Sequence, residues 1–315
     1  MSKQEWHDFH DNCHPWHWPT CVRALTILIS AGAPNVFPAD SGTARAATDL
    51  KRSTSMKLRL LRNATLILEV AGRTILIDPF FAPKHSRPAF AGRSRNPLVD
   101  LPTSTDEILD GVELVIVSHL HSDHFDSLAQ SLVPKQLPLI SQPGDEDKIR
   151  SFGFENVTPL IDTIDWQGIR LTRRDGQHGF GAVVEKMGPV IGFSIEAAHE
   201  PTLYWSGDTV LYPPVEATIR NTRPDIIVVH PCGALWEGEQ IAMDAEQAVA
   251  VCNAAPDAIV VATHLDSLDH ATVGRADLRQ HALARGISAA QLRIPDDGQI
   301  LEFGAAVAAP HAAAR

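Results

Sequence analysis

One short turn of this sequence holds three histidines and an aspartate. The segment 118–124 reads SHLHSDH and directly follows an apolar run that predicts a buried strand. A strand that ends in such a turn can aim His119 and His121 at one metal ion while Asp123 and His124 reach a second ion. Neutral imidazole and carboxylate ligands suit zinc first, with manganese and iron as alternatives. The segment therefore predicts a centre that binds two divalent metal ions.

Such a centre needs about three further ligands from other parts of the chain. His178 follows a strand-like run in a glycine-flanked turn, Asp208 lies in the turn 206–209 after another apolar run, and His264 directly ends a third run. We expect His178 to complete a three-histidine site, Asp208 to bridge both ions and His264 to complete the second site. Each residue alone is also typical of an ordinary turn or core position, so the prediction depends on all three together.

Four further residues are candidates for supporting roles. Asp78 lies in a turn that enters the site and could orient a ligand histidine, because such rings pass their second N–H to a carboxylate; the alternative is a loop-capping aspartate. His270 is a candidate to contact the substrate or to protonate the leaving group. It also competes with His264 for the last ligand position, where we favour His264 because it abuts the strand end. For His230 and Cys232, a place in the pocket lining and a structural role both stay open.

The chemistry follows from the ligand types. A metal ion lowers the pKa of bound water toward about 7 and polarises a carbonyl or phosphoryl oxygen, so no serine or cysteine nucleophile is required. The predicted mechanism is hydrolysis by a hydroxide that bridges two ions, with Asp123 as a metal ligand that also orients the hydroxide. The expected substrate is a small molecule with an ester-like bond, a lactone or a phosphodiester. Specificity depends on loops such as 82–102 and 233–241, whose conformations the sequence does not determine.

Alternating strands and helices position these side chains. Ala71-Gly72 predicts a hairpin turn in an antiparallel meander near the start of the domain. Continuous hydrophobicity in 225–229 and 258–262 predicts strands that are buried on both faces. The other predicted strands are 57–62, 65–70, 74–77, 112–117, 169–172 and 202–205, and the predicted helices begin near Ser104 and span 145–150, 214–220, 244–254 and 271–285.

The 315 residues are consistent with one domain over 56–304, because no Gly/Ser/Pro linker divides that stretch. Residues 1–55 lack steady periodicity, and we interpret them as a poorly ordered extension upstream of a natural start at Met56. Two alternatives stay open for this segment. It could be an exported leader, because a short apolar core precedes the small residues around 44–46, or its histidines could bind a metal. Residues 305–315 form an alanine-rich tail.

The composition restricts the partners. A net charge of −11 argues against binding to nucleic-acid phosphates, which requires clustered lysine and arginine. No apolar stretch approaches the ~20 residues of a membrane-spanning helix. The four cysteines are too few and too scattered for a disulfide framework, which favours a cytoplasmic location; export is the alternative if residues 1–55 act as a leader. The expected partner is a small-molecule substrate, and homo-oligomerisation stays open.

The order of these motifs resembles that of the metallo-β-lactamase superfamily of metallohydrolases. The family pattern is an aspartate in an early turn, then HxHxDH, a separate histidine, a bridging aspartate and a final histidine. In this sequence the pattern falls on Asp78, His119, His121, Asp123, His124, His178, Asp208 and His264. Through RNAT at 62–65, LIDP at 76–79 and GDT at 207–209, the chain is similar to the branch with ascorbate-6-phosphate lactonase and N-acyl-phosphatidylethanolamine phospholipase D. The resemblance covers about 57–304 and implies a four-layer αβ/βα sandwich of the α/β class, with the metals at one edge.

The same resemblance brings two alternatives to the hydrolase prediction. Some members of the superfamily carry a diiron site and are redox enzymes, but these typically have a glutamate where this chain has His121, and they carry a flavin domain that this chain lacks. A second alternative is a non-catalytic metal-binding module. Because all seven predicted ligands are present, we favour the hydrolase.

Overall fold

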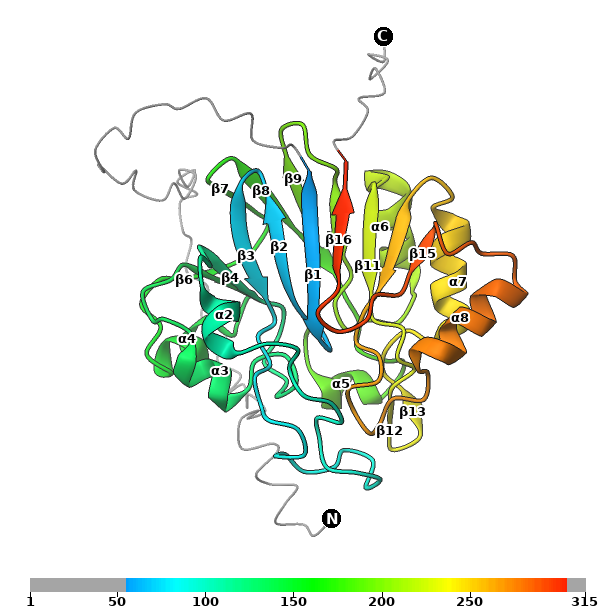
Figure 1. The fold of residues 1–315 in the computed structure, drawn as a ribbon, viewed down its shortest axis with the longest axis horizontal. Helices are drawn as coiled ribbons and strands as arrows, with labels where there is room; N and C mark the ends of the chain where they lie inside the picture. The colour runs from blue at the N-terminus through cyan, green and yellow to red at the C-terminus, as the bar shows by residue number, and fades with distance from the viewer. Residues whose placement is uncertain (1–54, 305–315) are drawn as a thin grey trace, which may run out of the picture. The chain divides into compact units, whose positions relative to one another are not determined.

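Two seven-stranded β-sheets form the centre of the computed structural model, which describes residues 55–304 of the chain (Figure 1). The first sheet has the order β16 (Ile300–Phe303), β1 (Met56–Arg62), β2 (Thr65–Val70), β3 (Arg73–Ile77), β4 (Leu114–Val117), β5 (Leu139–Ser141) and β6 (Val157–Pro159). The second has the order β15 (Leu292–Arg293), β14 (Ile259–Ala262), β11 (Ile226–Val229), β10 (Leu203–Trp205), β9 (Ile191–Ala197), β8 (Ile169–Asp175) and β7 (Thr163–Trp166). A small hairpin pairs β12 (Leu235–Trp236) with β13 (Glu239–Gln240).

Helices lie beside both sheets, which confirms the αβ/βα sandwich (Figure 1). The first sheet is accompanied by α2 (Thr105–Leu109), α3 (Ser127–Leu132) and α4 (Glu146–Ser151). The second sheet is accompanied by α6 (Pro213–Thr222), α7 (Ala245–Ala254) and α8 (Arg275–Ala284), while α5 (Val183–Met187) follows β8. The segments 1–54 and 305–315, which hold almost all of the predicted extension and the predicted tail, lie outside the described residues.

The strand directions bring the predicted site residues to one edge of each sheet. In the first sheet β3, β4 and β5 are parallel, and in the second β10, β11 and β14 are parallel. Strand β8 runs in the same direction as β10, because each pairs antiparallel with β9 between them. Residues that follow these strands therefore gather at shared edges. The meander β1-β2-β3 is antiparallel as predicted.

Burial of the strands explains why the sequence patterns were informative. Strand β11 is buried along its whole length, and β14 along three of its four residues, as their continuous hydrophobicity predicted. The aromatic side chains of Phe125 and of Phe193 in β9 are fully buried in the core, and each such burial contributes about 1.5–3 kcal/mol. The strand ends are thus fixed by a close-packed core. None of the helices in 55–304 is both long and apolar enough to cross a lipid bilayer.

Two predicted helix starts are confirmed and one is wrong. The Ser104 and Asp244 side chains cap α2 and α7 by accepting backbone N–H groups three residues ahead. The helix predicted from residue 271 begins instead at Arg275. The N–H groups of Thr272 and Val273 both donate to the Cys232 carbonyl at 2.9 Å, so this segment lies outside the helix.

Candidate metal centre

The first group of potential ligands consists of three histidines that follow two strands. His119 and His121 come after β4, His178 comes after β8, and their ligand atoms all lie within 4.8 Å of one another. The Nδ1 of His178 donates to the Ile241 carbonyl at 2.6 Å, and the Nε2 of His121 donates to the Met187 carbonyl at 2.9 Å. Since one ring nitrogen of each residue is occupied in this way, the other nitrogen is the one available to a metal.

His119 and His178 test whether this group fits a metal ion. The His119 Nε2 is buried, and no described residue lies within hydrogen-bonding distance of it. Burial lowers the pKa of His119 well below its usual value and lowers that of His178 to about 4. Both rings are therefore neutral, which is the form of histidine that binds metals. The buried, unpartnered nitrogen and the neutral rings fit a metal site.

The second group combines two aspartates with two histidines. Asp123, His124, Asp208 and His264 are all buried, and their ligand atoms lie within 4.8 Å of one another. The Asp208 Oδ2 lies 3.2 Å from His124 Nε2, 3.7 Å from His264 Nε2 and 3.6 Å from His178 Nε2. Because His178 belongs to the first group, a single carboxylate oxygen lies beside ligands of both groups. This is the position that a bridging ligand requires.

The carboxylates of this group are charged in spite of their burial. Burial alone would raise the pKa of Asp208, but His124 and His264 outweigh it and hold the pKa well below its usual range. The pKa of Asp123 is lowered in the same way, with burial again opposed by His124 and His264. Two buried carboxylates among imidazoles form a donor set that suits zinc, manganese or iron.

Asp78 fixes the orientation of one histidine. It directly follows β3 and accepts a hydrogen bond from His124 Nδ1 at 2.8 Å. Its carboxylate also accepts from the Ser118 backbone N–H at 2.7 Å and from the Ser118 hydroxyl at 2.6 Å. These contacts direct the Nε2 of His124 toward Asp208. The geometry is that expected of a residue that orients a ligand rather than one that only caps a loop.

Replacing Asp78 with asparagine should weaken metal binding about 10- to 100-fold, because the His124 ring loses the carboxylate that orients it. Titration of the metal-free variant with zinc measures the change. Asp126→Asn is the matched control, since Asp126 is equally buried and accepts three backbone N–H groups but contacts neither ligand group. Equal metal affinity in Asp78→Asn and the unmodified protein would contradict this role for Asp78.

Two residues at the centre were missed or left open by the sequence analysis. His230, which ends β11, donates from Nδ1 to Asp208 Oδ1 at 2.6 Å and leaves Oδ2 facing the ligand groups. Asn63, in the turn after β1, donates to the Asp123 carbonyl at 3.0 Å and lies 3.2 Å from His264 Nε2. For His230 the available signal is its position directly after β11, which lies between the strands that precede Asp208 and His264. Burial would lower the pKa of His264, but Asp208 and then the buried Cys232 raise it well above its usual value.

His270 lies outside both ligand groups of the described residues. It is buried, and its ring meets the Phe90 ring edge-on at a centroid distance of 5.1 Å. No described residue lies within hydrogen-bonding distance of its buried Nδ1. The ligand atom grouped with Asp123 and Asp208 is that of His264.

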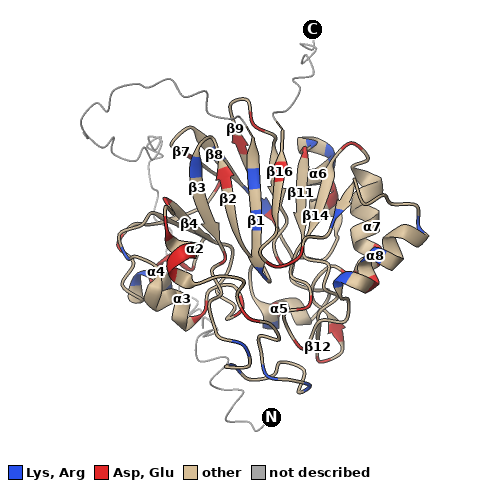
Figure 2. Cartoon of the chain, in the orientation of Figure 1, with Lys and Arg blue, Asp and Glu red and all other residues tan. Residues whose placement is uncertain are grey.

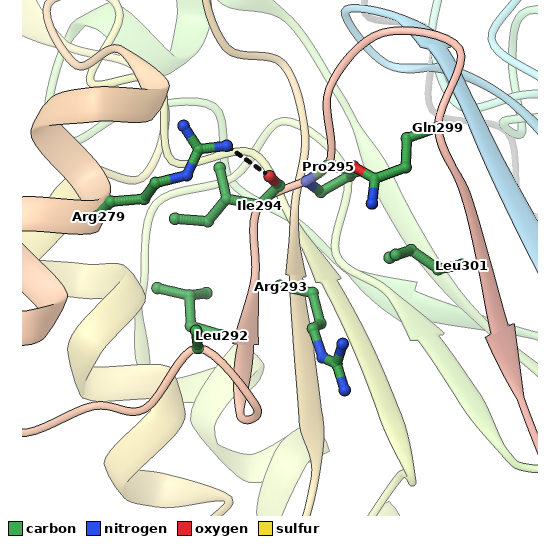
Figure 3. A pocket seen from close by; sticks show the side chains of 8 residues that line it. Arg279, Leu292, Arg293, Ile294, Pro295, Gln299 and Leu301 are labelled. Carbon is green, nitrogen blue, oxygen red and sulfur yellow. Dashed lines mark hydrogen bonds between the residues drawn. The ribbon is translucent and has the colours of Figure 1, made fainter.

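A surface pocket of about 180 Å³ lies between α8, β15 and β16 (Figure 3). Arg279 and Arg293 line it together with apolar side chains, and Arg279 donates to the Ile294 carbonyl at 2.9 Å. None of its lining residues belongs to either ligand group. The pocket is therefore separate from the candidate centre.

Comparison with known proteins agrees with this geometry. The β-lactamase superfamily domain matches residues 73–265, which include every member of both ligand groups. The UPF0173 protein YddR of Bacillus subtilis is 36% identical over 261 residues, which cover 79% of this chain and 100% of that protein. UPF0173 metal-dependent hydrolases of other organisms match at lower identity, among them one from Xanthobacter autotrophicus at 26% over 55% of this chain and 70% of its own length.

Solved structures are similar to this chain in both fold and sequence. A possible metal-dependent hydrolase from Veillonella parvula superposes with a TM-score of 0.76 at 33% identity and covers 78% of this chain and 99% of its own. An isothiocyanate hydrolase from Delia radicum gut bacteria superposes with a TM-score of 0.75 at 35% identity and covers 79% of this chain and 100% of its own. The chain thus belongs to the β-lactamase superfamily and is a metal-dependent hydrolase.

Proposed function

We propose that this hydrolase uses a dinuclear centre, with zinc as the preferred ion, to cleave an ester-like bond in a small molecule. The observation that carries the proposal is the place of the Asp208 Oδ2, within 3.7 Å of histidine nitrogens from both ligand groups. His119, His121 and His178 would hold one ion. Asp123, His124 and His264 would hold the other, with Asp208 shared between them.

The residues of this chain would have distinct roles in the proposed reaction. Two ions held there would lower the pKa of a water molecule to about 7 and polarise the oxygen of the scissile group. The Asp123 carboxylate is charged, and its Oδ2 lies 3.2 Å from His264 Nε2. It would therefore bind metal and also accept a hydrogen bond from the attacking water. Asn63 fixes this residue by donating to its backbone carbonyl.

His270 is proposed to contact the substrate. Burial lowers its pKa to about 4, so the ring is neutral near pH 7 and is poorly suited to protonate a leaving group as an imidazolium. A neutral ring can still donate or accept one hydrogen bond, and the buried Nδ1 is available for it. Between the two roles considered from the sequence, this favours contact with the substrate.

Replacing His270 with alanine should reduce turnover about 10- to 100-fold while both metal ions stay bound. The expected loss is moderate because the neutral ring positions the substrate and does not hold the centre together. Steady-state kinetics and metal analysis of the same sample measure the two effects. His281→Ala on α8 is the control, since His281 pairs with Glu246 and neither residue belongs to a ligand group. Loss of one metal equivalent in His270→Ala would make His270 a ligand in place of His264.

A second candidate substrate class is the isothiocyanates. The observation that favours it is the 35% identity and full-length superposition with an isothiocyanate hydrolase. Water would add to the central carbon of R–N=C=S to give a thiocarbamic acid, which decomposes to an amine and carbonyl sulfide. The electrophilic carbon of this group is open to the same attack as the carbon of an ester.

The charge distribution supports a small molecule over a polyanionic polymer. The net charge is −11, and in Figure 2 lysine and arginine are dispersed among aspartate and glutamate over the described elements. Binding to a nucleic acid depends on clustered cations that neutralise successive phosphates. A centre that holds two cations would attract a single anionic or polar group instead.

The proposal is tested by metal analysis combined with a substrate panel of lactones, bis-aryl phosphodiesters, β-lactams, N-acyl phospholipids and alkyl or aryl isothiocyanates. We expect about two zinc ions per chain and hydrolysis of a lactone, a phosphodiester or an isothiocyanate that stops on chelation and returns with zinc. Two iron ions with oxygen consumption would replace the proposal with the diiron redox alternative. Bound metal without hydrolysis of any compound would support the non-catalytic module.

A further inference from the structure

The loop between β3 and α2 is held by one buried carboxylate from a distant part of the chain. Asp269 is 4% exposed and accepts backbone N–H groups from four residues of this loop (Figure 1, cyan). The donors are Phe90 at 2.7 Å, Ala91 at 3.1 Å, Arg93 at 3.0 Å and Ser94 at 3.3 Å. A carboxylate that binds four backbone amides within five residues in this way fixes the backbone in one conformation.

Asn96 completes this contact from the loop side. Its Nδ2 donates to Asp269 Oδ1 at 2.9 Å, and its Oδ1 accepts the Asp269 N–H at 2.9 Å. Asn96 is 1% exposed, so the two residues exchange these hydrogen bonds in the interior. Neither Asp269 nor Asn96 belongs to a ligand group.

A second buried charge holds the flanks of the same loop. The Arg62 guanidinium is fully buried and donates to the carbonyls of Phe80 at 2.9 Å, Ala82 at 3.0 Å and Val99 at 3.0 Å. The loop has no helix and no strand beyond the isolated bridge between Arg87 and Asn96. Its conformation is therefore set by these side chains and not by regular secondary structure.

The fixed loop places one aromatic side chain beside the candidate centre. Phe90 packs with Phe80, Ala82 and Leu268, and its ring meets the His270 ring at 5.1 Å. His270 in turn lies close enough to the ligand groups for Asp123 and Asp208 to influence its protonation. Phe90 thus contacts a residue that itself lies near the ligand groups.

We propose that Asp269 is a positioning residue that holds the loop 88–97 so that Phe90, beside His270, forms an apolar wall of the substrate pocket. This wall selects substrates that carry an aliphatic or aromatic substituent next to the scissile group. The inference rests on the proposed function, since the wall acts on a substrate only if the neighbouring groups bind metal. It names the substrate class of that same centre.

The same loop suggests a competing specificity that the test must separate. Residues 82–97 include Lys84, Arg87, Arg93 and Arg95 and no acidic residue. Cations near the centre would favour an anionic substituent. However, Arg95 donates to the His85 and Ser86 carbonyls inside the loop, whereas the side chain in contact with His270 is that of Phe90.

The binding of hydroxamates tests the proposed apolar wall without requiring catalysis. Their oxygens chelate metal ions, while their substituent would occupy the substrate pocket. The probes are acetohydroxamate, benzohydroxamate and 4-carboxybenzohydroxamate, titrated into the zinc-loaded protein by calorimetry. The variants are Phe90→Ala, Asp269→Asn and Asn96→Ala, with Ser94→Ala as the control. In Asp269→Asn an amide N–H₂ must face loop N–H donors in either orientation, whereas Ser94→Ala keeps its backbone donor.

We expect benzohydroxamate to bind the unmodified protein at least about 10-fold more tightly than acetohydroxamate, as a phenyl ring on an apolar wall requires. The ratio of the two dissociation constants should fall toward one in Phe90→Ala. It should fall several-fold in Asp269→Asn and Asn96→Ala, in which zinc content stays full and hydrogen exchange of the 90–94 amides becomes faster. Ser94→Ala should keep the original ratio.

Two results would contradict the proposed apolar wall, and a third would contradict the dinuclear centre itself. An unchanged ratio in Phe90→Ala or in both Asp269→Asn and Asn96→Ala would overturn the wall. Tightest binding of 4-carboxybenzohydroxamate would replace it with recognition of an anion by the basic loop. Binding of no hydroxamate together with absence of zinc would overturn the proposed dinuclear centre itself, and with it the assignment of this loop to substrate.

Discussion

Replacing Asp208 with asparagine should leave a folded protein that cannot hold its metal ions and that has lost more than about 100-fold of its activity. Changes to residues that only orient a ligand cost about 10- to 100-fold, and Asp208 faces ligands of both groups, so its loss should cost more. An asparagine keeps the shape of the side chain, and its oxygen can still accept the hydrogen bond from His230. The effect therefore isolates the charge and the shared Oδ2.

The same variant should melt at a lower temperature. A metal bound only by the folded state stabilises that state, by about 2.7 kcal/mol at a free concentration 100 times the dissociation constant. For a domain of this size such a loss lowers the melting temperature by about 5–10 °C. Metal analysis by mass spectrometry and calorimetric melting with excess zinc measure both effects.

Two further variants show whether the loss of metal is specific to Asp208. Asp225→Asn removes a carboxylate that accepts from Thr202 outside the centre, and it should keep full metal content. His119→Ala removes one ligand of the first group alone, so it should lose the ion of that group before the other. Full metal content and an unchanged melting temperature in Asp208→Asn would show that Asp208 is not a ligand.

The positions of most predicted ligands could be read from the sequence because they follow buried strands, whereas His178 follows β8, whose residues alternate between buried and exposed. Strand β4 is apolar and buried along its length, so the polar segment that begins at Ser118 marks the sheet edge. The same transition precedes Asp208 after β10 and His264 after β14. A strand buried on both faces must be apolar throughout, and its end is therefore visible as a change of composition.

The partners of these residues could not be predicted, because they depend on the order of strands in the sheet. His230 meets Asp208 because β11 lies between β10 and β14, an order that the sequence does not express. Asn63, which follows β1, reaches Asp123 after β4 of the same sheet and His264 after β14 of the other sheet, through contacts between residues 60 and 201 positions apart. Periodicity predicts local structure and carries no information on such pairings.

The conformation of the loop between β3 and α2 also depends on residues that are distant in the sequence. Its backbone is fixed by Arg62 and by Asp269, which lies 175–179 residues away from the amides that it binds. No local pattern of turn residues determines this conformation. The predicted start of α8 was wrong for a related reason, since the N–H groups of residues 272 and 273 donate to the distant Cys232 carbonyl. Long-range hydrogen bonds override helix propensity at both places.

Metal binding to the metal-free protein should release about two protons near pH 7.5. Burial alone would lower the pKa of His124, but Asp208, Asp123 and Asp78 outweigh it and raise the pKa to about 10. The pKa of His264 is also raised well above its usual value, with burial opposed by Asp208 and Cys232. Both rings therefore carry a proton at pH 7.5, and a metal can bind only after that proton leaves. Calorimetric titration with zinc in buffers of different ionisation enthalpy counts the protons released.

The same pKa shifts give the stability of the metal-free protein and its affinity for zinc opposite dependences on pH. A raised pKa in the folded state stabilises the metal-free protein fully below the unfolded pKa of about 6.5, and this contribution is lost as the pH rises toward 10. The melting temperature of the metal-free protein should therefore fall between pH 6.5 and 9.5, while its affinity for zinc rises. Asp78→Asn removes one of the carboxylates that raise the pKa of His124, so it should release fewer protons. Binding heats that do not depend on the buffer would show that the two rings are neutral before the metal arrives.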